Sequence, residues 1–327
     1  MLQFIIRRTL VALVTIWVIS VVSFIIIQLP PGDFLTTYAA NLRAMGELAP
    51  EEQLTAMREH YGLGEPVYVQ YYKWIRGVLR GDFGRSLEWG VPVDMLLWDR
   101  LGLTVLVGIS SVLFVWTFAI PIGVFSATHQ YSISDYFFTF IGLLGVAVPS
   151  FLMALVLMWV AFSVFGQDVG GLFSPEYENA PWSVDKVLDL LKHLWPAMLI
   201  VGTEGAAGLI RTMRANMLDE LNQPYVETAR AKGLSERRLI WKYPVRVALN
   251  PFVSTVGYYL PQLVGGVVVV AVVLNLPTIG PLLLRSLLSQ DMFMAGAIVM
   301  IISILTVIGT LISDILLAML DPRIRIE

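Results

Sequence analysis

The chain has 327 residues, of which 57% are hydrophobic and 14% are charged, and its formal net charge is −3. Soluble domains are typically ~45–50% apolar and ~25% charged, so this composition excludes an ordinary soluble domain and predicts a membrane protein with several spans. The chain has no cysteine, which excludes disulfides, thiolate metal sites and a cysteine nucleophile.

The first apolar run follows a short basic N-terminus that contains Arg7 and Arg8. No charge interrupts Thr9–Leu29, and ~20 apolar residues are enough to cross a bilayer. A secretory signal has a shorter apolar region and a small-x-small cleavage site, whereas here the run leads into "QLPPGD". We therefore predict a retained first transmembrane helix.

Six apolar runs of spanning length occur along the chain, and no period-two alternation of a β-barrel competes with them. The sequence thus predicts an all-α integral membrane protein with six transmembrane helices. Pro251 and Pro261 are expected to kink or bound the fifth span. The predicted spans are Thr9–Leu29, Leu101–Thr128, Tyr136–Phe165, Leu194–Ile210, Leu249–Leu274 within the uncharged stretch Val247–Leu284, and Met292–Leu320.

These spans divide the chain into three parts. Residues 1–29 form the N-terminus and first helix, residues 30–100 an extracytoplasmic segment, and residues 101–327 the core, with a charged loop over 211–247. The side that holds this loop and both termini carries more lysine and arginine than acid, and the opposite side carries more acid. By the positive-inside rule both termini are cytoplasmic.

Two short helices are expected in the extracytoplasmic segment. "LAPEEQLTAMREHYGL" has Pro50 at a first helical position and Gly62 past the end. "VYVQYYKWIRGVLRGDFGRSL" interleaves apolar and basic residues, as in a helix lying on a membrane face. Tryptophans near the span ends predict an interfacial belt, with a docking or sugar-stacking surface as the alternative: Trp74, Trp89, Trp98, Trp182 and Trp195.

Catalytic and metal-binding patterns are missing from the sequence. Its three histidines are scattered, and it contains no Gly-x-Ser-x-Gly, His-Glu-x-x-His or Walker A motif. We predict a protein that is not an enzyme, with no catalytic residues, no metal and no cofactor. Any work it does must draw on a partner or a gradient.

Two acids lie inside predicted spans, where a charged group costs ~2.5–3.5 kcal/mol and is rarely idle. Glu204 is either a packing residue, satisfied by a neighbouring helix or by Arg211, or a translocation-pathway residue that meets a cationic substrate group. Small residues around it allow a neighbouring helix to approach closely: Gly202, Gly205, Ala206, Ala207 and Gly208. For Asp314, near the end of the sixth span, a structural pairing with loop arginines is favoured.

The densest charge of the chain lies between Pro224 and Pro244. Val226, Ala229 and Gly233 recur at helical spacing on one small, apolar face. Such a stripe on a charged helix suits insertion into a groove on a soluble partner. The alternative is a solvated loop that only anchors topology. Charged residues surround the stripe: Glu227, Arg230, Lys232, Arg237 and Arg238.

The wording of this loop favours the docking interpretation. "ETARAKGL" resembles the cytoplasmic "EAA" loop of ABC-importer permeases, with Glu227-Thr228-Ala229 and Gly233 in the matching positions, although the trailing Leu-Pro is absent. "PPGDF", "GDFGRSL", "GVAVPSF" and "LDPRIR" resemble further motifs of that family. Together they are similar to the dipeptide, oligopeptide and nickel permeases, in the B-type subunit. Glu204 departs from the family pattern.

The resemblance implies a type I ABC-importer permease fold in a bacterial or archaeal plasma membrane. It implies a coupling helix, with Val226, Glu227, Ala229, Arg230 and Gly233, that seats in the ATPase. The implied partners are a second homologous permease, two ATP-binding subunits and an extracytoplasmic binding protein, with no nucleic acid. Peptides are the expected substrates. Oligosaccharide or nickel-chelate import, a gradient-driven carrier and a non-transporting scaffold remain alternatives.

Overall fold

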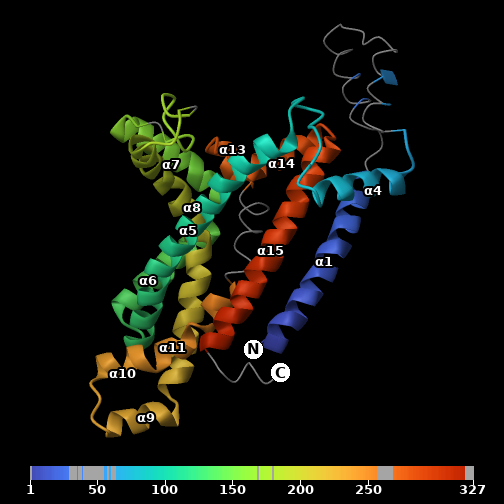
Figure 1. The fold of residues 1–327 in the computed structure, drawn as a ribbon. Helices are drawn as coiled ribbons and strands as arrows, with labels where there is room; N and C mark the ends of the chain where they lie inside the picture. Colours follow the sequence, from blue (N-terminus) through green and yellow to red (C-terminus); the bar gives the residue numbers. More distant parts are fainter. Residues whose placement is uncertain are drawn as a thin grey trace. The chain divides into compact units, whose positions relative to one another are not determined.

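The computed structural model describes residues 2–28, 64–167, 169–178, 180–255 and 268–320, with a few single residues between 35 and 59. Within these ranges the regular structure is helical, apart from one isolated bridge between Arg85 and Pro92. The all-α prediction is confirmed for this part of the chain. Figure 1 labels its helices in chain order.

Three helices are long and apolar enough to cross a membrane on their own: α1 (Leu2–Gln28), α5 (Val93–Thr128) and α15 (Met292–Leu320). They cover the predicted first span up to Gln28 and contain the predicted second and sixth spans. A fourth span is present if the bent pair α6 and α7 counts as one. Several apolar spans are therefore confirmed, whereas the count of six stays a prediction.

The chain forms two compact units. The first contains residues 105–277 and 308–327, and the second contains residues 2–104 and 278–307. Because α5 and α15 each pass from one unit to the other, we describe the packing of each unit by itself.

The predicted third span is wrong as a single helix. Two helices, α6 (Ile133–Ala147) and α7 (Ser150–Phe165), meet at an angle of 102°. Pro149 disfavours helical geometry in the residue before it, and Val148 is extended, with φ −91° and ψ 123°. Gly166 then ends α7 with φ 63°. The uninterrupted hydropathy of Tyr136–Phe165 gave no sign of the break that Pro149 causes.

The predicted fourth span is the middle of a much longer helix, α8 (Val184–Leu221). The side chain of Ser183 caps it by accepting the backbone N–H of Lys186 at 3.2 Å. Charged residues at its two ends limit its hydropathy but not its helicity, because lysine, arginine and glutamate are good helix formers. Hydropathy therefore identified a helical stretch and missed the helix boundaries, and a membrane span over Leu194–Ile210 stays a prediction.

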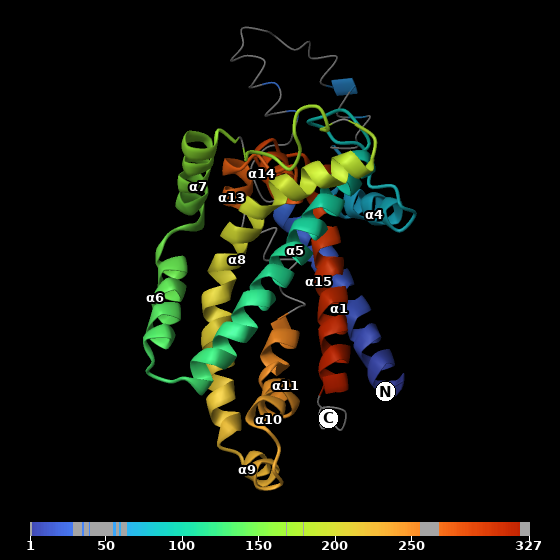
Figure 2. The same ribbon diagram turned by 90° about the vertical axis from the view of Figure 1, so that its left-hand side faces the viewer.

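Small residues bring α5 and α6 close to α8 in the first unit (Figure 2). A β-carbon added at Gly123 of α5 would lie 2.5 Å from Cβ of Met213, and one added at Gly202 of α8 would lie 2.6 Å from the ring of Phe114. At Gly142 of α6 it would lie 3.5 Å from Ala207. The expectation that small residues near position 204 admit a neighbouring helix is confirmed.

The core of the first unit lies between α5, α8, and α11 (Pro244–Ala248) with the helical residues 250–255 that follow. Met213, Met217 and Phe252 are fully buried in it. Pro251 lies within the helical backbone, and Pro261 falls outside the described residues. Helical structure is described again in α13 (Val268–Val273). The middle of the predicted fifth span is thus outside the described residues.

The second unit contains α1, α4 (Val67–Val78) and α14 (Ile279–Leu288). The expected amphipathic segment is helical over α4. Its Tyr71 hydroxyl lies 2.8 Å from the Ser20 hydroxyl of α1, and Trp74 packs on Phe24 and Met300. Trp74 is only 6% exposed, so its place in an interfacial belt was predicted wrongly. The helix predicted after Pro50 lies outside the described residues, except for isolated positions.

Candidate functional site

The predicted docking segment folds as two short helices, α9 (Pro224–Ala231) and α10 (Glu236–Lys242). We call residues 224–243 the α9–α10 hairpin. Pro224 occupies the first turn of α9, where its missing N–H costs no helical hydrogen bond. Figures 1 and 2 show α9 beyond the end of α8, with α10 between α9 and α11.

Gly233 makes the turn between the two helices. Its φ is +80°, a left-handed conformation that glycine adopts without steric cost. The N–H of Leu234 bonds to the carbonyl of Ala229 at 3.3 Å, and the N–H of Gly233 to that of Arg230 at 3.0 Å. This pair of bonds is a Schellman motif, which commonly ends a helix. Gly233 therefore ends α9, as expected for a glycine that follows a helix.

The predicted apolar stripe faces the other helix of its own hairpin. Val226 and Leu239 are fully buried and Ala229 is 7% exposed, and the three form one cluster flanked by Leu234 and Tyr243. The expectation that Val226 and Ala229 present a free contact face is corrected, because α10 already covers them. A partner that contacts α9 meets its opposite, exposed side, which carries Glu227, Thr228 and Ala231.

A bidentate ion pair joins the two helices on the hairpin surface. Arg230 Nε donates to Glu236 Oε1 at 2.5 Å, and Nη2 donates to Oε2 at 3.2 Å. The hydrogen bond raises the pKa of Arg230 and lowers the pKa of Glu236. Such a fork adds geometric definition rather than much stability when both groups are exposed. Arg230 therefore fixes the position of α9 relative to α10 through a contact on the hairpin surface.

Tyr225 connects the hairpin to α8. Its hydroxyl donates to the Glu220 carboxylate in the last turn of α8. Thr228 Oγ1 donates to the carbonyl of Pro224 at 2.8 Å within α9. At the other end of the hairpin, α11 packs on both α10 and α8. The hairpin is thus attached to α8 through both of its ends.

The two predicted intramembrane acids are placed differently. The backbone of Glu204 lies in α8, but its side chain is outside the described part of the structure. Asp314 lies in α15, is half-buried and has an interaction partner. Next to it, Ser313 Oγ donates to the carbonyl of Val253 at 2.6 Å. The pairing of Asp314 with loop arginines stays a prediction.

Asp135 has a structural role that the sequence did not reveal. Its side chain, 5% exposed, accepts two hydrogen bonds from Arg214 of α8, at 3.2 and 3.1 Å, and one from the N–H of Tyr131 at 3.1 Å. Ser132, the N-cap of α6, accepts the N–H of Asp135 at 3.2 Å. The Ser-x-x-Asp spacing is the local signal for the cap, but nothing local identified Arg214.

A second polar cluster occurs in the second unit and centres on Asp291, which is fully buried. Its carboxylate accepts the Ser86 hydroxyl at 2.5 Å and the backbone N–H groups of Glu88 and Met294, each at 3.1 Å. The bond from Met294 makes Asp291 the N-cap of α15. Burial raises the pKa of Asp291, and the hydrogen bonds that its carboxylate accepts oppose that rise without cancelling it.

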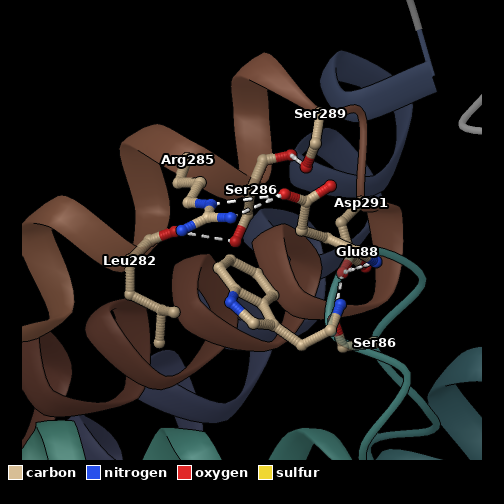
Figure 3. Close-up of polar contacts among 8 residues, drawn as sticks. Ser86, Glu88, Leu282, Arg285, Ser286, Ser289 and Asp291 are labelled. Carbon is tan, nitrogen blue, oxygen red and sulfur yellow. Dashed lines mark hydrogen bonds and ion pairs between the residues drawn. The ribbon is translucent and has the colours of Figure 1, made fainter. Parts of the chain in front are cut away.

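Arg285 of α14 completes this cluster, shown in Figure 3. It donates to Glu88 Oε1 through Nε at 3.2 Å and Nη2 at 3.1 Å, and its guanidinium carbon lies 5.2 Å from the ring centroid of Trp89. We call Ser86, Glu88, Arg285 and Asp291 the Asp291 clamp. It joins the loop after α4 to α14 and to the start of α15. The quoted "GDFGRSL" motif supplies Ser86, but Asp291 carries no sequence signal.

Neither the α9–α10 hairpin nor the Asp291 clamp has the composition of a catalytic or metal centre. Within the described ranges, no group of three or more histidine, aspartate or glutamate side chains could hold a metal ion. The hairpin offers an exposed helical face on a buried apolar support. The Asp291 clamp offers a fixed loop. These two sites therefore offer surfaces for contact and fixed positions between elements rather than reactive groups.

Comparison with known proteins gives the context for this geometry. Residues 119–326 match the family described as "Binding-protein-dependent transport system inner membrane component", and residues 1–91 match its N-terminal family. The chain is 38% identical to the oligopeptide transport system permease protein AppB of Bacillus subtilis over 99% of this chain and 100% of the relative. It is 29% identical to the dipeptide transport system permease protein DppB of Alkalihalophilus pseudofirmus over 99% and 100%, and 32% identical to OppB of Mycobacterium tuberculosis over 85% and 86%.

Proposed function

Because this chain belongs to the family of binding-protein-dependent transport system inner membrane components, we propose that it forms one half of a peptide-translocating pore. A second, homologous permease supplies the other half, two ATP-binding subunits supply the energy, and an extracytoplasmic binding protein delivers the substrate. As the membrane permease component it is a non-catalytic subunit. The observation that carries the mechanism is the α9–α10 hairpin.

Peptides are the proposed substrate class because the relatives AppB, DppB and OppB are named for oligopeptide or dipeptide transport. Oligosaccharide and nickel-chelate import are the alternatives within the same branch. A gradient-driven carrier would take up substrate after ATP depletion, and the proposed importer would not. Calorimetry with the cognate binding protein distinguishes the three ligand classes directly.

The membrane topology proposed here has six spans of a type I importer, with both termini in the cytoplasm. The middle of α8 supplies the fourth span, and residues 249–274 supply the fifth. Lysine and arginine are concentrated in the loop 211–247 and near the termini, which favours the cytoplasmic side. Labelling of single introduced cysteines with an impermeant maleimide tests each loop, because the natural chain has none.

The hairpin is proposed as the coupling element, with α9 as the helix that seats in an ATP-binding subunit. Glu227, Thr228 and Ala231 are its exposed face. Val226 and Ala229 act from within, by packing on Leu239 so that α9 and α10 move together. The Arg230–Glu236 fork and the Gly233 turn hold the angle between them. A displacement of α9 is then passed to α8 and α11 rather than absorbed inside the loop.

Cross-linking tests the contact. A cysteine at Thr228, on the exposed face of α9, should form a cross-link to a cysteine in the ATP-binding subunit, and the yield should change between nucleotide-free and ATP-bound states. Val184→Cys, 76% exposed at the opposite end of α8, is the control and should give none. If no exposed position of α9 forms a cross-link in a complex that transports peptide, α9 is not the docking helix.

The two intramembrane acids complete the proposal. Glu204 is a candidate pathway residue in α8, beside the close α5–α8 contact at Gly202. Asp314 is proposed as a structural or gating residue of α15, next to the Ser313–Val253 hydrogen bond. Both are proposed from their position in apolar helices, where an acid is retained at a cost in insertion energy.

A further inference from the structure

One side of α10 carries three cations and a tryptophan, and the coupling role does not use them. Arg237, Arg238, Trp241 and Lys242 are all exposed, with Trp241 51% exposed. At 100° per residue these four positions fall within an arc of about 140°. Glu236, the acid of α10, lies outside that arc and is held by Arg230. The exposed side is therefore basic, with a single aromatic residue in it.

The other side of α10 is occupied within the chain. Leu239 packs on Val226 and Ala229 of α9, and Ile240 packs both there and against the core that contains Phe252. The basic side lies opposite Leu239, so it points away from α9. Figures 1 and 2 place α9 at the far end of the unit and α10 between it and the membrane helices. The basic side of α10 is thus the side that neither α9 nor the core around Phe252 covers.

Its composition suits the boundary between headgroups and water. Tryptophan is enriched at that depth because its ring is amphipathic, and long basic side chains extend from it to reach phosphate oxygens. Clusters of lysine and arginine next to a span attract anionic lipids. An ATP-binding subunit seated on the exposed side of α9 would meet the opposite end of the hairpin. The positive charge and the exposed tryptophan both favour the lipid surface as the occupant.

We propose that α10 is an interfacial anchor, in which Arg237, Arg238 and Lys242 bind the phosphates of anionic phospholipids and Trp241 lies among the headgroups. The anchor supports α10 while α9 is moved by its partner, so that the hairpin pivots rather than translates. This inference uses the membrane location of the chain and the fold of the hairpin. It does not require that α9 docks an ATP-binding subunit.

The absence of cysteine in the natural chain permits a direct depth measurement. Trp241→Cys is labelled with an environment-sensitive fluorophore, in the permease pair reconstituted in phosphatidylcholine bilayers with or without phosphatidylglycerol. Headgroup spin-labelled lipid is the quencher. Ala231→Cys, exposed on the far side of α9, is the matched control. We expect quenching at position 241 to exceed that at 231 by about threefold or more, and to increase with phosphatidylglycerol.

Neutralisation of the cations tests the chemistry separately. In the labelled Trp241→Cys background, Arg237→Gln, Arg238→Gln and Lys242→Gln together should remove the phosphatidylglycerol dependence, while Lys232→Gln should leave it unchanged. Equal quenching at 241 and 231, with iodide reaching both, would show a solvated face and overturn the proposal. So would protection of position 241 only after ATP-binding subunits are added, because the face would then be a protein contact. Neither measurement depends on transport or ATP hydrolysis. The anchor can therefore be tested even if the coupling proposal fails.

Discussion

The hydroxyl of Ser86 donates a 2.5 Å hydrogen bond to the carboxylate of Asp291, although 205 residues separate the two in the chain. Ser86 lies in the loop after α4, and Asp291 caps the first turn of α15. The same carboxylate accepts the N–H of Glu88. One buried side chain therefore positions a loop and begins a transmembrane helix.

We expect Asp291→Ala to lower the stability of the complex more than Asp291→Asn. Alanine leaves the donors of Ser86, Glu88 and Met294 without this acceptor, at a cost of about 1–3 kcal/mol per buried group. Asparagine keeps one carbonyl oxygen, and the raised pKa of Asp291 indicates that a neutral group is tolerated there. Thermal unfolding of the purified complex measures both, with the exposed Asp99→Asn as control. Equal losses for both variants would contradict the cap and clamp role.

Gly233→Glu should abolish substrate-stimulated ATP hydrolysis while membrane insertion stays intact. The structure gives the reason, because a side chain at φ +80° strains the turn that sets α10 against α9. No described atom lies within 4 Å of a β-carbon added there, so strain rather than a clash inside the chain is responsible. Asparagine tolerates this conformation, and Gly233→Asn should retain most of the activity. Normal coupling in Gly233→Glu would refute the role of this turn.

Gly123→Ala should destabilise the first unit by about 1–3 kcal/mol, the usual cost of an overpacked core. Its new methyl group would lie 2.5 Å from Cβ of Met213, an atom fixed close to the backbone of α8. Gly208→Ala is the matched control in α8, since no described atom lies within 4 Å there and alanine is the better helix former. The unfolding midpoint should fall for the first variant and not for the second. A fall of equal size in both variants would show that the Gly123–Met213 contact does not limit stability.

Acid should weaken the attachment of the loop after α7 to α8. The Ser174 N–H and hydroxyl donate to Asp189 at 2.7 and 2.6 Å. Burial raises the pKa of Asp189, but these bonds and the nearby basic residues outweigh it, so the net pKa lies below the usual range of an aspartate. A carboxyl whose folded pKa is depressed stabilises above its unfolded value, and that stability is lost as the pH falls through the folded pKa. The unfolding midpoint of the natural protein should therefore drop as the pH falls below the ordinary pKa of an aspartate, and Asp189→Asn should be less stable at neutral pH with a flatter acid response.

Glu204→Gln should slow uptake of cationic peptides more than uptake of neutral peptides of the same length. A pathway carboxylate attracts a positive group, and glutamine keeps its size while removing that attraction. Initial uptake rates in proteoliposomes, at saturating binding protein, give the comparison. Equal effects on both peptides would favour the packing role for Glu204.

Features encoded locally were predicted well. The ends of α15 coincide with the predicted Met292–Leu320, because an uninterrupted apolar run is both the span and the helix. For α8 the two differ, since charged but helix-compatible residues extend it on both sides of Leu194–Ile210. The break at Pro149 was also encoded locally, but the length of the apolar run concealed it.

Contacts between distant residues were not predicted. Val226 and Ala229 were expected to face a partner, because helical spacing shows which residues share a side and not what covers that side. Leu239 covers them, and only the left-handed turn at Gly233 brings it there. For Asp135 and Asp291, the fold alone identified Arg214 and Ser86 as partners.

The sequence by itself determined that this protein is a helical membrane permease, because hydropathy and motif spacing are properties of short stretches of chain. Tertiary structure decided which faces are free. A face is covered or exposed according to what packs against it, and that depends on turns and long-range hydrogen bonds that no single stretch contains. For the α9–α10 hairpin, this moved the expected docking surface from Val226 and Ala229 to Glu227, Thr228 and Ala231, and left the basic side of α10 available for the membrane.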